Sequence, residues 1–61
     1  MKFRIKLEAT KYVVQRSTDS GRTFETISSP YATEAEARLR LEIHFVQAAG
    51  RLPQPGEVTV V

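Results

Sequence analysis

The sequence predicts an α+β fold, a three-stranded antiparallel meander packed by one helix (β-β-β-α), with a possible short fourth strand at the C-terminus. Three observations lead to this prediction. Apolar and polar residues alternate strictly over residues 1–9, a pattern typical of a half-buried strand. Two further segments rich in β-forming residues, 12–17 and 23–28, flank a polar turn that contains one glycine. Residues 34–49 then contain neither proline nor glycine and are rich in Ala, Leu, Arg and Glu, as expected of a helix.

The first strand has one apolar and one charged face, because successive side chains of a strand point to opposite sides of the sheet. The face expected to meet the core carries five apolar residues: Met1, Phe3, Ile5, Leu7 and Ala9. The opposite face carries three cations and one acid: Lys2, Arg4, Lys6 and Glu8. Cations on one face of a strand lie about 7 Å apart, comparable with the spacing of successive phosphates along one DNA strand.

This basic face is a candidate nucleic-acid contact, and two cations of the second strand extend it. The candidate contact residues are Lys2, Arg4, Lys6, Lys11 and Arg16. Contacts of this kind to phosphates give salt-sensitive binding with little sequence preference. The alternative interpretation is that alternating lysines keep an open sheet face soluble and protect its edges.

The turn between the second and third strands has a distinctive pattern: Ser17-x-Asp19-x-Gly21-x-Thr23-Phe24. We expect the first two of these side chains to hydrogen-bond nearby backbone amides and the glycine to adopt a positive φ. The last two start the return strand. Because Phe24 and Ile27 are out of phase for one face of a flat strand, we also expect a bulge or twist near this end of the hairpin.

The eight-residue turn resembles an Asp-box (BNR-type) motif, the S-x-D-x-G-x-T-[W/F] element found in hairpins of sialidase-type β-propellers. In those propellers the motif lies away from the catalytic centre. The resemblance therefore implies the geometry of a hairpin, and it implies no sialidase activity.

The helix has clear start and stop signals. Thr33 and Glu36 form a capping box at its N-terminus, and Gly50 is a natural C′ residue after its last turn. At about 100° per residue, its apolar residues form two separate stripes. The stripe expected to cover the sheet contains Ala35, Leu39, Ile43 and Val46. The second stripe contains Leu41, Phe45 and Ala48.

The second stripe requires another cover, which is either the C-terminal segment or a second copy of the protein. Residues 57–61 read as a short strand that pairs within the chain, pairs with another subunit, or frays. The candidate self-association residues are Leu41, Phe45, Ala48, Val58 and Val60.

The joint between hairpin and helix carries a second resemblance. Tyr31, Thr33, Glu36 and Ala37 are similar to the F-x-T-x-x-E-A joint of the arm-type DNA-binding domains of tyrosine integrases. Those domains lay a three-stranded sheet in the major groove and back it with a helix. This chain departs from them because its hairpin is not strongly basic.

Length and composition describe one small domain, residues 1–61, near the lower size limit for folding alone. The chain has no cysteine, so neither disulfides nor a thiolate metal site can support the core, and oligomerisation often completes such cores. The net charge of +2 is uneven: residues 1–24 carry +4 (6 − 2) and residues 25–61 carry −2 (3 − 5).

No pattern of residues indicates catalysis. The four serines lie at turns and not in a nucleophile elbow, and His44 has no second ligand at metal-binding spacing. We therefore expect no enzyme, no catalytic residues, no cofactor, no metal site and no small-molecule substrate. The first residues lack an apolar run that could serve as a signal peptide or membrane span, so we expect a cytoplasmic protein with no membrane partner.

Two functions follow from these patterns. The first is a small non-enzymatic protein-interaction module that self-associates, as a homodimer, through the second helix stripe or the C-terminal strand. The alternative is a nucleic-acid-binding module that uses the basic face of the sheet.

Overall fold

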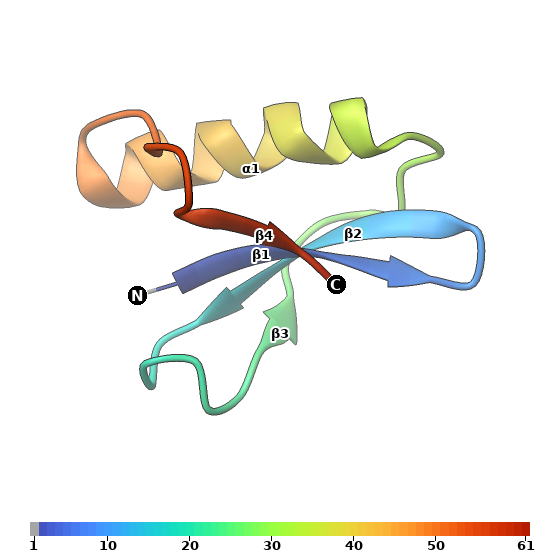
Figure 1. The fold of residues 1–61 in the computed structure, drawn as a ribbon, viewed down its shortest axis with the longest axis horizontal. Coiled ribbons are helices and arrows are strands. Elements are labelled where there is room, and N and C mark those ends of the chain that lie inside the picture. The colour runs from blue at the N-terminus through green and yellow to red at the C-terminus, as the bar shows by residue number, and fades with distance from the viewer. Residues whose placement is uncertain (1) are drawn as a thin grey trace.

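In the computed structural model, which describes residues 2–61, a four-stranded sheet is covered on one face by a single helix (Figure 1). The elements follow one another as β1 (Lys2–Glu8), β2 (Lys11–Ser17), β3 (Glu25–Thr26), α1 (Glu34–Ala49) and β4 (Val58–Val60). The strands lie in the order β3-β2-β1-β4. The predicted α+β fold with a short C-terminal fourth strand is therefore confirmed. Met1, placed by the alternation on the core face of the first strand, lies outside the described residues.

The C-terminal strand β4 pairs within the chain, which resolves the choice that the sequence left open. It runs parallel to β1, with Val58 opposite Phe3 and Val60 opposite Ile5. Its pairing continues to the last residue, because the Val61 amide donates to the Ile5 carbonyl at 2.9 Å. The chain thus returns from the helix to the open edge of β1, the edge that β2 does not occupy.

Strand β3 is shorter than the predicted segment of residues 23–28, and the reason is a side chain that replaces a backbone partner. The amide of Val14 donates to the Ser28 hydroxyl at 2.9 Å instead of to a carbonyl. Backbone pairing resumes only at Tyr31, which exchanges two hydrogen bonds with Tyr12 at 2.7 and 2.8 Å. The ladder is therefore interrupted just before Pro30, which has no amide hydrogen to donate.

Of the bulge or twist expected near the hairpin end, the bulge is not found in the pairing of β2 with β3, because Phe24 and Ile27 do not share a face of the sheet. Phe24 lies under the guanidinium of Arg4, on the face away from the helix. Ile27 packs against the hydrophobic core on the helix side. Residues three positions apart on a regular strand point to opposite faces, so this alternation needs no extra residue.

Helix α1 begins and ends where the sequence predicted. Its N-cap is Thr33, whose hydroxyl accepts a hydrogen bond from the Glu36 amide at 3.2 Å. Its C-terminus is closed by Gly50, which adopts the left-handed conformation with φ of 75° and donates to the Val46 carbonyl at 2.8 Å. A residue with a Cβ would be strained there.

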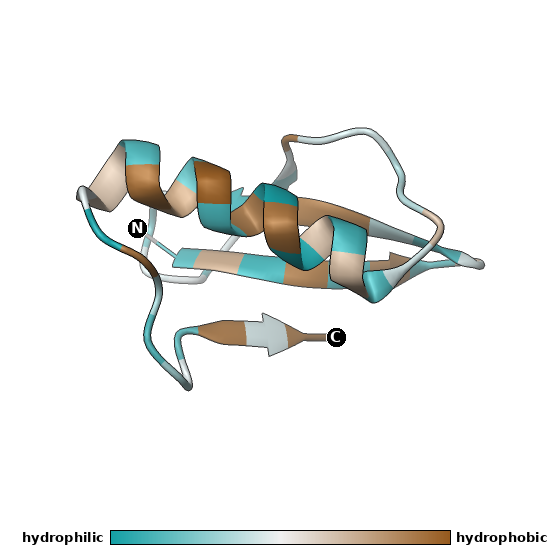
Figure 2. Cartoon of the chain, turned by 90° about the horizontal axis from the view of Figure 1, so that it is seen from above, coloured by the Kyte–Doolittle hydropathy of each residue, from teal (hydrophilic) through white to brown (hydrophobic). Residues whose placement is uncertain are grey.

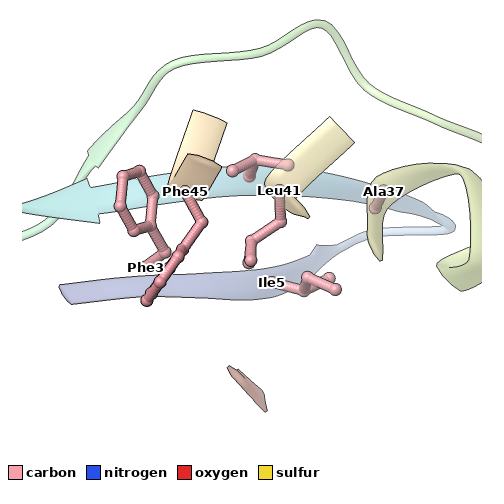
Figure 3. Packing of buried hydrophobic residues seen from close by; sticks show 6 residues of the cluster. Phe3, Ile5, Ala37, Leu41 and Phe45 are labelled. Carbon is pink, nitrogen blue, oxygen red and sulfur yellow. The ribbon is translucent and has the colours of Figure 1, made fainter. Parts of the chain in front are cut away.

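The stripe of α1 that faces the sheet is not the one predicted, but the one on the opposite side of the helix. The buried residues of α1 are Ala37, Leu41 and Phe45, of which Leu41 is fully buried and Phe45 is 6% exposed. They pack against β1 and β2, as Figure 3 shows for the contact of Phe45 with Phe3 and of Leu41 with the strand beneath it. The assignment of Ala35, Leu39, Ile43 and Val46 to the core is therefore wrong.

The reason lies in side-chain volume rather than in the number of apolar residues. The predicted stripe has four apolar members, but the buried one carries Phe45, the largest apolar side chain of the helix. The rings of Phe45 and Phe3 lie 5.7 Å apart at an interplanar angle of 53°, a favourable tilted arrangement. Ala37, which is completely buried, is small enough to let the first turns of the helix approach the sheet.

This correction also removes most of the predicted self-association set. Leu41 and Phe45 form the centre of the chain's own core, and Val58 packs against that core from β4. Ala48 is exposed at the end of the helix, and Val60 is 41% exposed. These residues therefore do not make one continuous apolar surface.

The two helix stripes give a direct test of this packing. We expect Leu41→Ala to lower the free energy of unfolding by about 2–5 kcal/mol, because it leaves a cavity in the core, and in so small a domain this loss can unfold the chain. Leu39→Ala, the same change at a residue that is 58% exposed, should cost less than about 0.5 kcal/mol. Urea denaturation at dilute protein concentration measures both. An equal loss from the two variants would contradict the observed orientation of the helix.

Candidate nucleic-acid interface

Within residues 2–61, no helix or second sheet covers the face of the sheet opposite α1 (Figure 1). Because Phe3 and Ile5 of β1 face the helix, the residues between them point to this open face. Register pairing places the side chains of β2 that lie opposite them on the same face. The open face thus carries four cations: Lys2, Arg4, Lys6 and Lys11.

The charge of this face is strongly one-sided. Its strand residues include one acid, Glu8, which lies opposite Lys11 in the register. The four cations and this acid give a local balance of 4 − 1 = +3, more than the net charge of +2 of the whole chain. The sequence prediction that the first strand presents a basic face is therefore realised in the geometry.

Arg16 does not belong to this face, which corrects the predicted contact set. It lies opposite Phe3 in the register and so points to the helix side of the sheet. There its guanidinium pairs with Glu25 of β3 at 2.5 Å. The sequence hid this orientation because both Val13 and Val14 of β2 are apolar, so alternation alone does not show which of them faces the core.

Arg4 is held at the centre of the open face by a row of polar contacts across three strands. Its Nε donates to the Gln15 side-chain oxygen of β2 at 2.8 Å. The Gln15 side-chain nitrogen in turn donates to the Thr26 hydroxyl of β3 at 3.2 Å. Gln15 is buried although it lies on the open face, so this row is close-packed and limits the motion of Arg4.

The guanidinium of Arg4 also stacks on an aromatic ring. Its Cζ atom lies 3.8 Å from the centroid of the Phe24 ring, close enough for a cation–π interaction worth roughly 0.5–2 kcal/mol. The Nε contact and the stack leave the two terminal nitrogens of Arg4 without a hydrogen bond to any described residue. Arg4 therefore presents a pre-oriented, planar donor group to solvent, which suits a phosphate or the face of a base.

The turn that supplies Phe24 is rigid, and its hydrogen bonds are those that the residue types predicted. The Ser17 hydroxyl accepts from the Gly21 amide at 2.8 Å and donates to Asp19 at 2.7 Å. Asp19 accepts from both the amide and the hydroxyl of Thr23, at 3.0 and 2.6 Å. Gly21 has a φ of 91°. These contacts hold the end of the turn in place, so that Phe24 lies beneath Arg4.

The same hydrogen bonds make Asp19 a strong acid. The Thr23 hydroxyl, the Ser17 hydroxyl and then the Thr23 amide all donate to its carboxylate, and they hold the pKa of Asp19 far below its ordinary value of 3.8. The carboxylate therefore remains charged and keeps the turn closed over the whole range of ordinary buffers.

Beside the Arg4–Phe24 stack lies an open hollow of about 560 Å³. Its lining includes Lys2, Arg4, Gly21, Phe24, Glu57 and Thr59. The acid among them is neutralised locally, because both terminal nitrogens of Arg51 contact Glu57, at 2.7 and 2.9 Å. These bonds, followed by one from the Gln54 amide, lower the pKa of Glu57 to about 2. The hollow thus joins the basic face to the C-terminal segment.

The sequence did not identify three residues of this surface. Phe24 was assigned only to the turn, while Gln15 and Thr26 carried no signal of their own. The register could have found Gln15 and Thr26, because once Phe3 is placed on the core face, the residues directly across from Arg4 must share its face. Phe24, two positions before Thr26, then falls on the same face by strand alternation.

Within residues 2–61, no three of the His, Cys, Asp and Glu side chains converge as metal ligands would. In the same range, no helix combines the length and apolar character needed to cross a bilayer.

No protein-family model matches the chain, and no curated protein or solved structure matches it either. The likenesses to an Asp-box and to the arm-type domains of integrases therefore remain resemblances of short motifs, and the function has to be argued from the site.

The acidity of Asp19 predicts how the turn responds to pH. Since its folded pKa is depressed, its stabilising contribution is present above the unfolded value near 3.8 and is lost as the pH falls below that value toward the folded pKa. We expect wild type to be more stable than Asp19→Asn at pH 6, with the difference shrinking steadily between pH 4 and pH 2. Urea unfolding of both proteins across this range measures it. A difference that stays constant with pH would show that the carboxylate charge contributes nothing.

Proposed function

We propose that this chain is a small non-enzymatic nucleic-acid-binding module that contacts phosphate groups through the open face of its sheet. The observation that carries the proposal is the placement of Lys2, Arg4, Lys6 and Lys11 on one uncovered face of two adjacent strands. The electrostatic attraction of such a face to a phosphate backbone is independent of sequence and releases condensed counterions.

The geometry of the face favours an extended polyanion over a single small anion. The three cations of β1 lie about 7 Å apart along the strand, and Lys11 lies on the neighbouring strand at the far end of the hairpin. A nucleic-acid backbone is long enough to contact several of these cations at once. The major groove of DNA, in turn, admits a two-stranded β-ribbon. The resemblance to the arm-type domains of integrases, which use a helix-backed sheet in that groove, also favours this mode.

The fixed position of Arg4 supports binding further, because a pre-oriented side chain loses less conformational entropy when a ligand arrives. Its stack on Phe24 holds the guanidinium against an aromatic surface, an arrangement that also accepts a stacked base. We therefore expect both duplex and single-stranded nucleic acid to bind, with little sequence preference.

We prefer this proposal to the self-association predicted from the sequence. The reason is that more of the predicted nucleic-acid contacts than of the predicted self-association residues lie on an accessible surface. Of the predicted contact residues, only Arg16 is displaced from the open face. Of the predicted self-association residues, the two largest, Leu41 and Phe45, are buried inside the chain. Self-association then requires a different surface from the one that was predicted.

Paired charge-removing variants test the proposal. Lys2→Gln with Lys6→Gln removes two open-face cations, whereas Arg38→Gln with Arg40→Gln removes two cations from the helix, so both bring the net charge from +2 to about zero. In fluorescence-anisotropy titrations of labelled duplex and single-stranded oligonucleotides at low salt, we expect the open-face variant to bind about tenfold or more weakly than wild type. The slope of log K against log salt concentration should also become less steep, by roughly 0.7–0.9 for each lost cation that touches a phosphate.

The helix variant is the matched control and should change the affinity by less than about threefold. Equal losses from the two variants would mean that net charge alone is responsible. Absence of binding by wild type at low salt would remove the proposal altogether.

A further inference from the structure

The side of α1 that faces away from the sheet carries an apolar stripe with no partner within the described residues. We call Ala35, Leu39, Ile43 and Val46 the outer stripe. Its three large members are 58%, 42% and 40% exposed, and they recur at the i, i+4 and i+7 spacing by which one helix packs on another. Figure 2, which views the chain from the helix side, shows hydrophobic residues along the whole of α1.

The chain's own C-terminal segment does not cover the outer stripe. After Gly50 the backbone turns back toward the sheet, where β4 joins the edge of β1. The guanidinium of Arg51 lies 5.1 Å from the ring centroid of Phe45, on the sheet-facing side of the helix. Leu52, the apolar residue nearest the helix end in this segment, is itself 64% exposed.

The charges that flank the outer stripe are self-complementary. At about 100° per residue, Glu36 and Arg40 lie on one side of the stripe, while Arg38 and Glu42 lie on the other. Each side therefore carries one acid and one base separated by four residues, and Arg38 also contacts Glu34 of its own chain at 3.1 Å. In an antiparallel pair of helices related by a two-fold axis, each side meets the same side of the other copy in reverse order. An acid of one copy then faces a base of its partner.

The charge at the helix ends favours an antiparallel arrangement over a parallel one. The first turn of α1 contains two acids, Glu34 and Glu36, and the last turn contains no base. A parallel pair would bring the two acidic first turns together, whereas an antiparallel pair separates them and aligns the helix dipoles favourably.

We infer that a second copy of this chain packs on the outer stripe, helix against antiparallel helix, to form a two-fold symmetric dimer. Each copy contributes one face of a helix about 24 Å long and roughly 10 Å wide, on the order of 240 Å², well below the roughly 800 Å² per partner of a standard stable interface. The dimer is therefore a weak one that assembles at high protein concentration. It leaves the two open sheet faces on opposite outer surfaces, so this inference does not depend on what those faces bind.

Sedimentation equilibrium over a range of concentrations tests the dimer. We expect wild type to move from 6.9 kDa toward twice that mass as its concentration rises. Ile43→Glu should remain at the monomer mass, because it places a charge at the centre of the outer stripe, and Leu39→Glu is a second variant at the same surface. Circular dichroism checks that both variants keep the fold, as expected for exposed helix positions.

Leu52→Glu is the matched control, since it makes the same change at an exposed apolar residue away from the helix. It should associate as wild type does. A wild type that stays monomeric at every concentration, or outer-stripe variants that associate as strongly as wild type, would overturn the inference.

A charge exchange tests the antiparallel arrangement. Arg40→Glu should weaken association about fivefold, the size expected when exposed ion pairs become repulsive. Adding Glu36→Arg to the same chain should restore it, because each acid again faces a base. In a parallel dimer these two residues would face Arg38 and Glu42 of the other copy, and the double variant would bind more weakly than the single one, which would contradict the antiparallel order.

Discussion

The packing of Phe45 on Phe3 determines how the rest of the molecule is arranged. It joins the last turns of α1 to the start of β1, and Leu41 and Ile5 extend the same contact toward the other end of the helix. Because one helix can cover only one face of a sheet, this contact fixes which strand residues are buried and which remain in water. The basic face of the sheet and the outer stripe of the helix are the two surfaces that it leaves open.

The open face is ordered even though no helix or second sheet within residues 2–61 covers it. The hydrogen-bonded row through Gln15 and the stack of Arg4 on Phe24 fix its centre. The turn that begins at Ser17 supports that stack from one end of the sheet, through side-chain bonds to its own backbone. In a chain without cysteine, such local polar contacts stabilise the segments that lie outside the small hydrophobic core. The held guanidinium of Arg4 therefore favours the proposed binding to phosphates, because less conformational entropy is lost when a ligand arrives.

Local signals in the sequence were sufficient for the elements but not for their packing. The helix ends were predicted from Thr33 and Gly50, since capping depends on a few neighbouring residues. The choice of helix stripe was wrong because both stripes are apolar, and only the fit of Phe45 against a partner far along the chain distinguishes them. Arg16 was misplaced for a similar reason, since two adjacent valines hide the alternation of β2. The position of β4 depends on a free sheet edge, which no local pattern shows.

We propose that the open face of the sheet, and not the helix, meets nucleic acid. The most direct measurement is a two-dimensional ¹H–¹⁵N NMR titration of the chain with a short DNA duplex at low salt. We expect shift changes concentrated on β1, the adjoining end of β2 and the turn around Phe24, with the residues of α1 unaffected. Shift changes centred on α1, or no changes at saturating DNA, would contradict it.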